Sequence, residues 1–242
     1  MCDVCGCQLT DTSDKRIVEV NRSLLAANDR QGVANQAHIE RMGAVAINLI
    51  SSPGAGKTTL LEHTIDALGS ELRIGVIEGD IETERDADRI RAKGVAAVQL
   101  TTGGACHLDA PLVHKGLHAL ERQVNSNLET AGRTKYDLIF IENVGNLVCP
   151  ATFYLGEHKR VILVSVPEGS DKPAKYPTTF RGADLFVITK TDLLDYFDFS
   201  LYEADKEARR IQSELEIMHL SATTGDGFSA WIDWLRRLLH LN

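Results

Sequence analysis

Three cysteines crowd the beginning of the chain, at Cys2, Cys5 and Cys7. Thiols this close together do not form an ordinary disulfide framework, and in a reducing compartment such clusters bind metal ions. With the α-amine of the chain they offer four donors, which suit Ni(II), Zn(II) or Cu(I). Removal of Met1 would move that amine to Cys2. The cluster predicts a metal-binding tail and leaves the metal open.

A second set of metal donors lies inside the chain. Cys106 and His107 follow an apolar run at residues 96–100, and Cys149 lies in the loop after the run at residues 136–142. If both runs are strands of one sheet, the three side chains could converge at the same edge. A Cys-His pair can also be structural, and spacing alone leaves both interpretations open. The remaining histidines are scattered along the sequence and are expected to be structural or surface groups: His38, His63, His114, His118, His158, His219 and His240.

Residues 51–58, Ser-Ser-Pro-Gly-Ala-Gly-Lys-Thr, lie between an apolar run and a helical pattern, the setting that a phosphate-binding loop requires. Glycines let backbone N–H groups approach phosphate, and Lys57 adds a positive charge. The hydroxyl of Thr58 can bind Mg²⁺. Ser51 stands where the usual pattern has its first glycine. The predicted nucleotide contacts in this segment are Gly54, Ala55, Gly56, Lys57, Thr58 and Thr59.

Two acids follow apolar runs at the predicted carboxyl edge of the sheet. Asp80 comes after residues 73–78, and Glu142 ends the run at residues 136–142. Together with Thr58 they are the predicted magnesium ligands. We expect Lys57, Thr58, Asp80 and Glu142 to form the polar catalytic set, which acts by positioning phosphate and neutralising charge. The sequence does not identify the base that activates water.

Lys190 and Asp192, in a Thr-Lys-Thr-Asp segment after an apolar run, predict which nucleobase the site selects. A carboxylate there can accept from both the ring N–H and the exocyclic amine of guanine, which favours GTP over ATP. The segment resembles the NKxD element of GTPases, with Thr189 in place of Asn. Ser221 and Ala222 follow the last apolar run and resemble the further loop that contacts the base.

The apolar runs alternate with amphipathic segments. Their continuous Val, Ile and Leu content predicts strands that are buried on both faces, in a doubly wound, mostly parallel α/β fold. The expected organisation is a flexible metal-binding tail and linker at residues 1–15, two short helices within residues 16–43 with a break near Gly32, and a GTPase domain at residues 44–242. The expected strands are residues 44–50, 73–78, 96–100, 136–142, 160–166, 184–189 and 216–220, and the expected helices of the GTPase domain are 57–68, 109–127, 201–214 and 227–241.

Composition excludes several functions. The formal net charge is −8, and Lys and Arg are interspersed with Asp and Glu, so the chain has no basic field for a nucleic acid. No apolar stretch approaches the roughly 20 residues that span a bilayer, and the first residues lack the apolar core of a signal peptide. We expect a cytoplasmic protein that binds neither nucleic acid nor membrane.

These segments together resemble the HypB family, the GTPases that incorporate nickel during [NiFe]-hydrogenase maturation. The resemblance covers nearly the whole chain and rests on the cysteine-rich start, residues 51–58, 78–83, 106–109 and 142–150, and the Lys-Thr-Asp element at 190–192. The family's loop also begins Ser-Ser-Pro-Gly, which accounts for Ser51. The chain has no His-rich segment after its cysteine cluster, so bulk nickel storage is not expected.

The resemblance implies a SIMIBI-type P-loop GTPase that uses GTP, GDP and Mg²⁺. It also implies a homodimer promoted by GTP and metal, with nickel or zinc bound at an interface formed by Cys106, His107 and Cys149. The implied partners are a small zinc-containing nickel chaperone of the HypA type and the hydrogenase large-subunit precursor.

Two alternatives remain at this point. The related urease nickel-delivery GTPase has a Cys-Pro-His element, whereas Cys106 and His107 are adjacent here and the N-terminal cysteines are an addition. This comparison favours the hydrogenase pathway. The chain could also be a metal sensor or scaffold that binds nucleotide without useful turnover. Single-turnover GTP hydrolysis, with and without metal, would separate these classes.

Overall fold

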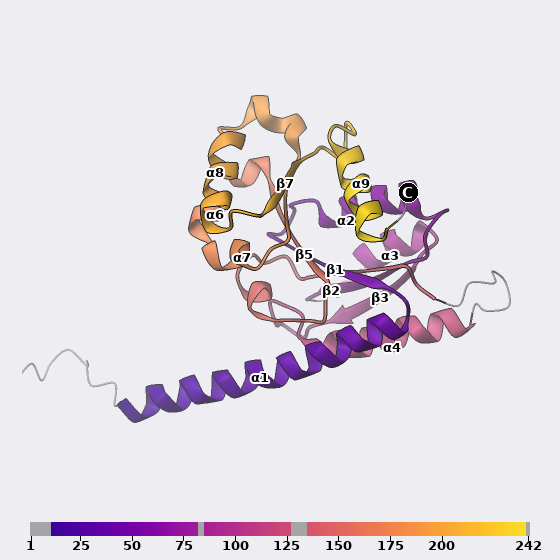
Figure 1. The fold of residues 1–242 in the computed structure, drawn as a ribbon, viewed down its shortest axis with the longest axis vertical. Coiled ribbons are helices and arrows are strands. Elements are labelled where there is room, and N and C mark those ends of the chain that lie inside the picture. The colour runs from indigo at the N-terminus through magenta and orange to yellow at the C-terminus, as the bar shows by residue number, and fades with distance from the viewer. Residues whose placement is uncertain (1–10, 82–84, 127–134, 241–242) are drawn as a thin grey trace, which may run out of the picture.

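The computed structural model describes residues 11–81, 85–126 and 135–240. Within them the strands form a seven-stranded sheet in the order β3-β2-β4-β1-β5-β6-β7, and all its pairings are parallel. The strands are β1 (Val45–Ser51), β2 (Ile74–Asp80), β3 (Ala96–Thr101), β4 (Leu138–Glu142), β5 (Lys159–Ser165), β6 (Leu185–Thr189) and β7 (Glu216–His219). The predicted strands and the parallel α/β class are confirmed (Figure 1).

Both faces of the sheet are buried, as the continuous apolar runs predict. In β4, Leu138 and Phe140 pack in the core on one face, and Ile139 and Ile141 pack in the core on the other. Successive side chains of a strand point to opposite faces, so such a strand must be apolar at every position.

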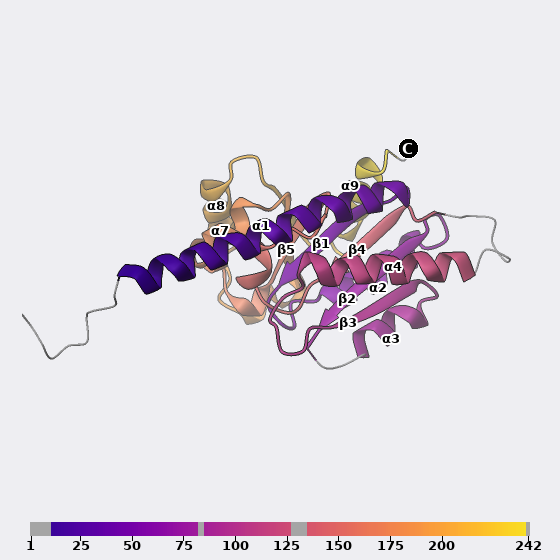
Figure 2. The same ribbon diagram turned by 90° about the horizontal axis from the view of Figure 1, so that it is seen from below.

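Helices cover the two faces (Figures 1 and 2). One face packs against α2 (Lys57–Leu68), α3 (Arg85–Ala92) and α9 (Phe228–Leu238). The other packs against α1 (Asp11–Arg41), α4 (Ala110–Ser126), α7 (Pro177–Arg181) and α8 (Leu201–Ile211), with the short α6 (Lys172–Lys175) beside α8. Three 3₁₀ turns, η1 (Cys149–Thr152), η2 (Val166–Glu168) and η3 (Thr191–Tyr196), lie in loops at the carboxyl ends of the strands.

The prediction of two short N-terminal helices is wrong. Residues Asp11–Arg41 form one helix, α1, without a break at Gly32. A Cβ atom at Gly32 would lie 2.7 Å from the carbonyl oxygen of Tyr154, and the same oxygen accepts a hydrogen bond from Asn28 Nδ2 at 2.9 Å. The glycine therefore allows a loop to approach the helix closely. It does not end the helix.

Residues 11–15, which the sequence places in the linker, are the first residues of α1. The C-terminal half of α1 lies beside α4, and its N-terminal half extends past the body of the domain (Figure 2). Cys2, Cys5 and Cys7 lie outside the described residues.

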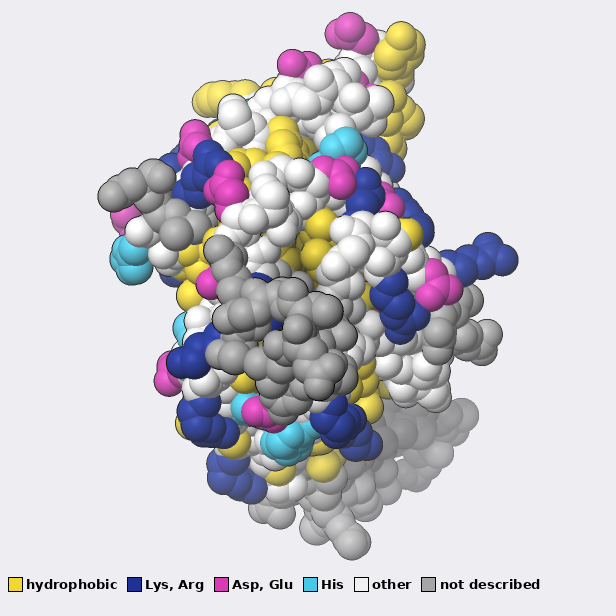
Figure 3. All heavy atoms as spheres, turned by 90° about the vertical axis from the view of Figure 1, so that its right-hand side faces the viewer, with side chains coloured by type: hydrophobic (Ala, Val, Ile, Leu, Met, Phe, Trp, Pro, Cys, Tyr) yellow, Lys and Arg dark blue, Asp and Glu magenta, His cyan; other side chains and the backbone are white. Residues whose placement is uncertain are grey.

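On the face in Figure 3, basic side chains lie beside acidic ones among the described residues. In the described part of the chain, ion pairs such as Arg89–Glu62 and Lys93–Asp66 join opposite charges. Among the helices that the structure describes, none combines the length and apolar character needed to cross a membrane.

Candidate nucleotide and metal sites

The phosphate loop joins the central strand β1 to α2. Gly54 and Gly56 have φ values of 75° and 98°, which only glycine adopts at little cost. A Cβ atom at either position would meet no described atom within 4 Å, so backbone conformation, and not packing, requires glycine there. No described side chain caps the beginning of α2, which leaves backbone N–H groups of its first turn for an anion.

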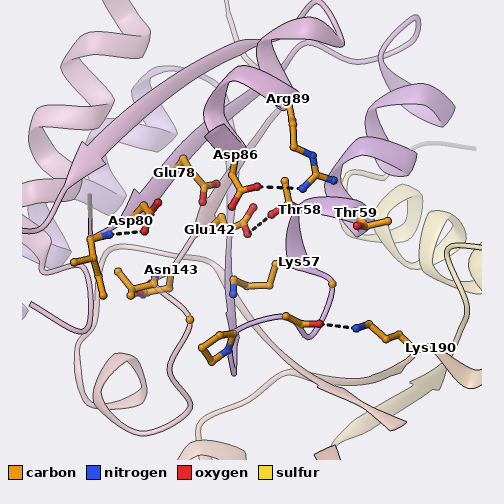
Figure 4. Close-up of a pocket in the computed structure, with 17 residues that line it drawn as sticks. Lys57, Thr58, Thr59, Glu78, Asp80, Asp86, Arg89, Glu142, Asn143 and Lys190 are labelled. Atoms are coloured by element: carbon orange, nitrogen blue, oxygen red, sulfur yellow. Dashed lines mark hydrogen bonds and ion pairs between the residues drawn. The ribbon is translucent and has the colours of Figure 1, made fainter. Parts of the chain in front are cut away.

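A cavity of about 450 Å³ opens beside this loop (Figure 4). Lys57 is buried in its wall, and its Nζ donates a hydrogen bond to Ser51 Oγ at 2.9 Å. Ser51 therefore gives the lysine a partner in this state. The loop, the ends of β2 and β4, and Lys190 together line a space with the chemistry of a phosphate site.

Two buried carboxyl groups, those of Glu142 and Glu78, line this cavity. The hydroxyl of Thr58 donates to Glu142 Oε1 at 2.8 Å, and Glu78 points toward Glu142 (Figure 4). Burial raises the pKa of both carboxyls, Lys57 opposes the rise at Glu142, and the charge of Glu142 adds to it at Glu78. The second oxygen of each carboxyl has no hydrogen-bond partner among the described residues. These oxygen donors fit a hard cation such as Mg²⁺.

Asp80 lies at the edge of the same cavity, where its Oδ1 accepts a hydrogen bond from the backbone N–H of Ile81 at 2.6 Å. The structure thus brings the four predicted polar residues, Lys57, Thr58, Asp80 and Glu142, to one cavity. Among the polar side chains that line the cavity, sequence reasoning missed four: Glu78, Asp86, Arg89 and Asn143. Glu78 and Asn143 carried a signal, because both are polar residues at the end of an apolar run.

Arg89 and Asp86 come from α3, which was not predicted. The helix has only two buried residues, Ala87 and Ile90, so it lacks a clear apolar period. In the structure Arg89 donates to Asp86 Oδ1 at 3.1 Å and to both oxygens of Glu62, which ties α3 to α2 beside the cavity.

A smaller cavity of about 190 Å³ lies next to the phosphate loop and is lined by Asp192, Ala222 and Thr223, among others. Thr189, which stands where GTPases usually have Asn, donates from its hydroxyl to the carbonyl oxygen of Ala55 at 2.6 Å. Lys190 Nζ donates to the carbonyl oxygen of Gly54 at 2.7 Å. Both contacts fix the segment at residues 189–192 to the phosphate loop.

Ser221 is fully buried, and its hydroxyl donates to Asp192 Oδ1. This hydrogen bond orients the carboxylate of Asp192 and so also restrains the position of its second oxygen. Asp192 itself is exposed and lines this cavity. The predicted base contacts Lys190, Asp192, Ser221 and Ala222 therefore lie in one region.

Cys106, His107 and Cys149 meet at the carboxyl edge of the sheet. One donor atom from each lies within 4.8 Å of the others, and Cys106 Sγ is 3.8 Å from His107 Nδ1. Burial lowers the pKa of His107, which favours the neutral imidazole that binds metal. The hydrogen bond with Cys106, and then burial, raise the pKa of Cys149. The ring of His107 stacks on Phe153 at 4.0 Å between centroids, which restrains its orientation.

Asn143 connects this thiol site to the phosphate cavity. Its Oδ1 accepts hydrogen bonds from the backbone N–H groups of Leu108 and Val144, each at 3.0 Å. Leu108 directly follows His107, and Asn143 directly follows Glu142 and lines the phosphate cavity. One buried side chain thus joins the loop that carries two metal donors to the strand end that carries a magnesium candidate.

Known proteins share this architecture. The model for the CobW/HypB/UreG nucleotide-binding domain matches residues 45–219. Hydrogenase maturation factor HypB of Azotobacter chroococcum mcd 1 is 46% identical over 225 residues, which cover 93% of this chain and 70% of that protein. The crystal structure of hydrogenase maturation factor HypB from Archaeoglobus fulgidus is similar with a TM-score of 0.79 at 39% identity, and covers 89% of this chain and 100% of that one.

HypB from Helicobacter pylori, solved in complex with nickel, is similar with a TM-score of 0.81 at 37% identity, over 88% of this chain and 95% of that one. Both solved structures carry the fold over most of the chain, and the family model begins at β1 and ends at β7. This chain therefore belongs to the HypB family of hydrogenase maturation factors, which are P-loop GTPases and hydrolyse GTP.

Proposed function

We propose that this chain couples GTP binding and hydrolysis to the delivery of nickel into the large subunit of a [NiFe]-hydrogenase during maturation. The observation that carries the proposal is the link through Asn143 between the phosphate cavity and the Cys106, His107 and Cys149 site. A metal site coupled in this way to a nucleotide site can hold metal in one nucleotide state and release it in another.

In the proposed reaction, backbone N–H groups of the loop at Gly54 to Thr59 and the charge of Lys57 hold the phosphates of GTP. Thr58, Asp80 and Glu142 are the proposed magnesium ligands, and Glu78 lines the same cavity. When bound, Mg²⁺ would supply charge neutralisation of the phosphate oxygens. Lys190, Asp192, Ser221 and Ala222 surround the guanine and select GTP over ATP.

The coupling follows from how little chain separates the two sites. Cys149 comes only seven residues after Glu142, and Asn143 holds both the start of that segment and Leu108. A shift of the strand end toward the γ-phosphate would therefore move both thiol-bearing loops together. Nickel is the cargo of this cycle, and zinc is an alternative occupant of the same donors.

Each chain supplies two thiols and one imidazole at this site, which leaves a nickel or zinc ion short of a full set of ligands. A homodimer promoted by GTP and metal would complete or bridge the site across a two-fold axis. The N-terminal Cys2, Cys5 and Cys7 form a separate proposed nickel site. A small zinc-containing chaperone of the HypA type and the hydrogenase large-subunit precursor are the proposed donor and acceptor partners.

The test uses a strain that lacks this protein and is complemented with the full chain or with Cys149→Ala. We expect the full chain to restore hydrogenase activity at low nickel, and Cys149→Ala to restore it only when nickel is added in excess. Urease activity is measured in parallel, where the strain has that enzyme, as the readout for the urease alternative. Equal rescue by both chains at low nickel would contradict the role of the site, and failure of excess nickel to rescue would contradict delivery.

A further inference from the structure

Three histidines that are scattered in the sequence meet in the structure. His38 lies on α1, and His114 and His118 lie on α4, where the two helices pack side by side (Figure 2). One ring nitrogen from each lies within 4.8 Å of the others. These histidines are expected from the sequence to be structural or surface groups, and their spacing along the chain does not indicate that they lie together.

The arrangement depends on the helix period and on helix packing. His114 and His118 are four residues apart on α4 and so share one face. Their ring centroids lie 4.6 Å apart, and the ring of His38 lies 4.8 Å from that of His118. A pair of histidines at this helical spacing is a common metal-binding unit, and the third ring comes from a helix 76 positions earlier in the sequence, counted from His38 to His114.

A carboxylate lies beside two of the three rings. Glu121 Oε2 lies 3.3 Å from His38 Nε2 and 3.5 Å from His118 Nδ1, so one oxygen faces two rings. His114 Nδ1 is buried and has no hydrogen-bond partner among the described residues. Glu121 therefore provides a partner for two of the imidazoles and leaves a donor nitrogen of the third unsatisfied.

We propose that His38, His114 and His118, with Glu121 as a fourth ligand, form a further metal site for a divalent transition ion such as Ni(II) or Zn(II). Imidazole and carboxylate are suitable ligands for both ions. Metal–nitrogen distances of about 2.0–2.1 Å place the donors of a tetrahedral site about 3.3 Å apart, so the rings must close slightly around the ion.

The structure allows that closure. The side chain of His38 is 6% exposed and is held between the helices, whereas those of His118 and Glu121 are 47% and 46% exposed. Rotation of the two exposed side chains brings their donors toward the fixed ring, and the same exposure gives an ion a route from solvent. The half-buried His114 is the remaining proposed ligand, beside the buried His38 and the two exposed side chains.

The site lies close to the thiol site but contains none of its residues. α4 begins at Ala110, three residues after His107, and His114 lies four residues further on, about 6 Å along the helix axis. The proposal goes beyond nickel delivery by the thiol site, because its donors contain no sulfur and their ability to bind metal requires no nucleotide.

The test titrates full-length protein with Ni(II) and separates the two kinds of site by their spectra. Total bound metal is measured by equilibrium dialysis, and thiolate-bound nickel by its sulfur-to-metal charge-transfer absorption, which a histidine–carboxylate site does not show. We expect His118→Ala to lose about one metal equivalent with unchanged charge-transfer absorption. Glu121→Gln should weaken that equivalent by about 10-fold or more. His63→Ala, an exposed histidine on α2, is the matched control and should change neither readout.

His38→Asn decides whether three histidines act together. If the site is as proposed, this buried substitution on α1 removes the same equivalent as His118→Ala, with the helical circular dichroism retained. Retention of that equivalent in His38→Asn would show that an exposed pair on α4 chelates nickel alone, and would overturn the site. Equal metal content in the parent, His118→Ala and His63→Ala proteins would also overturn it. The outcome is independent of hydrogenase activity and of GTP.

Discussion

Asp192 carries the predicted choice between guanine and adenine. Its carboxylate is oriented by the buried hydroxyl of Ser221 and lies at the end of the cavity beside the phosphate loop. In Asp192→Asn, one charged acceptor becomes an amide with both donor and acceptor character. Loss of a hydrogen bond to a charged group costs about 1.5–3 kcal/mol, so we expect GTP affinity to fall by roughly 10- to 150-fold while ATP affinity changes little.

Calorimetric titration of both nucleotides measures this change. Asp195→Asn is the control, because Asp195 is exposed in the same turn η3 and does not line the cavity. If the parent protein bound ATP and GTP equally, the role of Asp192 in base selection would be wrong.

Removal of one of the two buried acids, Glu78 and Glu142, should have opposite effects on protein stability and on GTP binding. Both are buried, and burial raises the pKa of each carboxyl. Without Mg²⁺ and nucleotide, a second acid beside Glu142 is unfavourable, because burial and the neighbouring carboxyl disfavour its charged form, so folding at neutral pH must add a proton to it. We expect Glu78→Gln to raise the free energy of unfolding by about 1 kcal/mol, which raises the melting temperature by about 2–4 °C.

The same substitution should weaken magnesium-dependent GTP binding, because it removes a charge that faces the proposed ion. Thermal unfolding with and without Mg²⁺ and GTP measures both effects in one experiment. Glu214→Gln is the control, since Glu214 is exposed and does not line the phosphate cavity. A loss of stability in nucleotide-free Glu78→Gln would show that the two acids are already satisfied without a cation.

Asp80 and Glu78 show which features of the site local sequence patterns can predict and which they cannot. Both lie in a Glu-Gly-Asp segment at the end of an apolar run, and the sequence predicts Asp80 as a ligand because it follows that run at the carboxyl edge of the sheet. The burial of Glu78 depends on β4 lying beside β2, a pairing between distant segments. Pair contacts of this kind require the strand order, which local periodicity does not contain.

At the scale of elements, hydrophobic periodicity predicts the seven strands and the helix α2 well, because each is a continuous or amphipathic run in a buried layer. It fails where the identity of a residue depends on a contact with a segment that is distant in the sequence. Gly32 reads as a helix break, but its absent side chain makes room for Tyr154. The three-histidine cluster also depends on packing between α1 and α4, which no local pattern reveals.

Gly32→Ala tests this account of α1. Alanine in a helix interior is favoured over glycine by about 1 kcal/mol, but a Cβ atom 2.7 Å from the carbonyl oxygen of Tyr154 overpacks the contact, which costs about 1–3 kcal/mol. We expect a net destabilisation of about 1 kcal/mol, measured by urea unfolding.

Ala34→Gly is the matched exchange at an exposed position of the same helix, where only helix propensity acts. It should also destabilise, by about 1 kcal/mol. Alanine would then be preferred at position 34 and glycine at position 32. Stabilisation by Gly32→Ala would mean that the loop at Tyr154 does not press against α1.

At the scale of the whole molecule, the phosphate cavity and the thiol site lie along one edge of the sheet and share the support of Asn143. We expect nucleotide state and metal to be linked through a dimer that both favour. Linkage then requires each to raise the affinity of the other by the same factor. Hydrolysis would relax the dimer and let a partner take the metal.

Analytical ultracentrifugation of the full chain tests this linkage. We compare GDP with a non-hydrolysable GTP analogue, each with and without Ni(II) or Zn(II), and expect the dimer to be most populated with the analogue and metal together. Cys149→Ala should remove the effect of metal on dimerisation while GTP binding persists, because Cys149 does not line the phosphate cavity.

Substitutions of Asn143 distinguish the coupling between the two sites from metal binding at the thiol site. Asn143→Asp keeps the acceptor that holds the backbone N–H groups of Leu108 and Val144, whereas Asn143→Ala loses it. If this side chain transmits the nucleotide state, Asn143→Ala should still bind metal at Cys106 and Cys149, but with an affinity that is equal in GDP and in the analogue. Asn143→Asp should retain most of the difference. A parent protein that stays monomeric in every condition, or whose metal affinity at this site ignores nucleotide, would show that the two sites act independently.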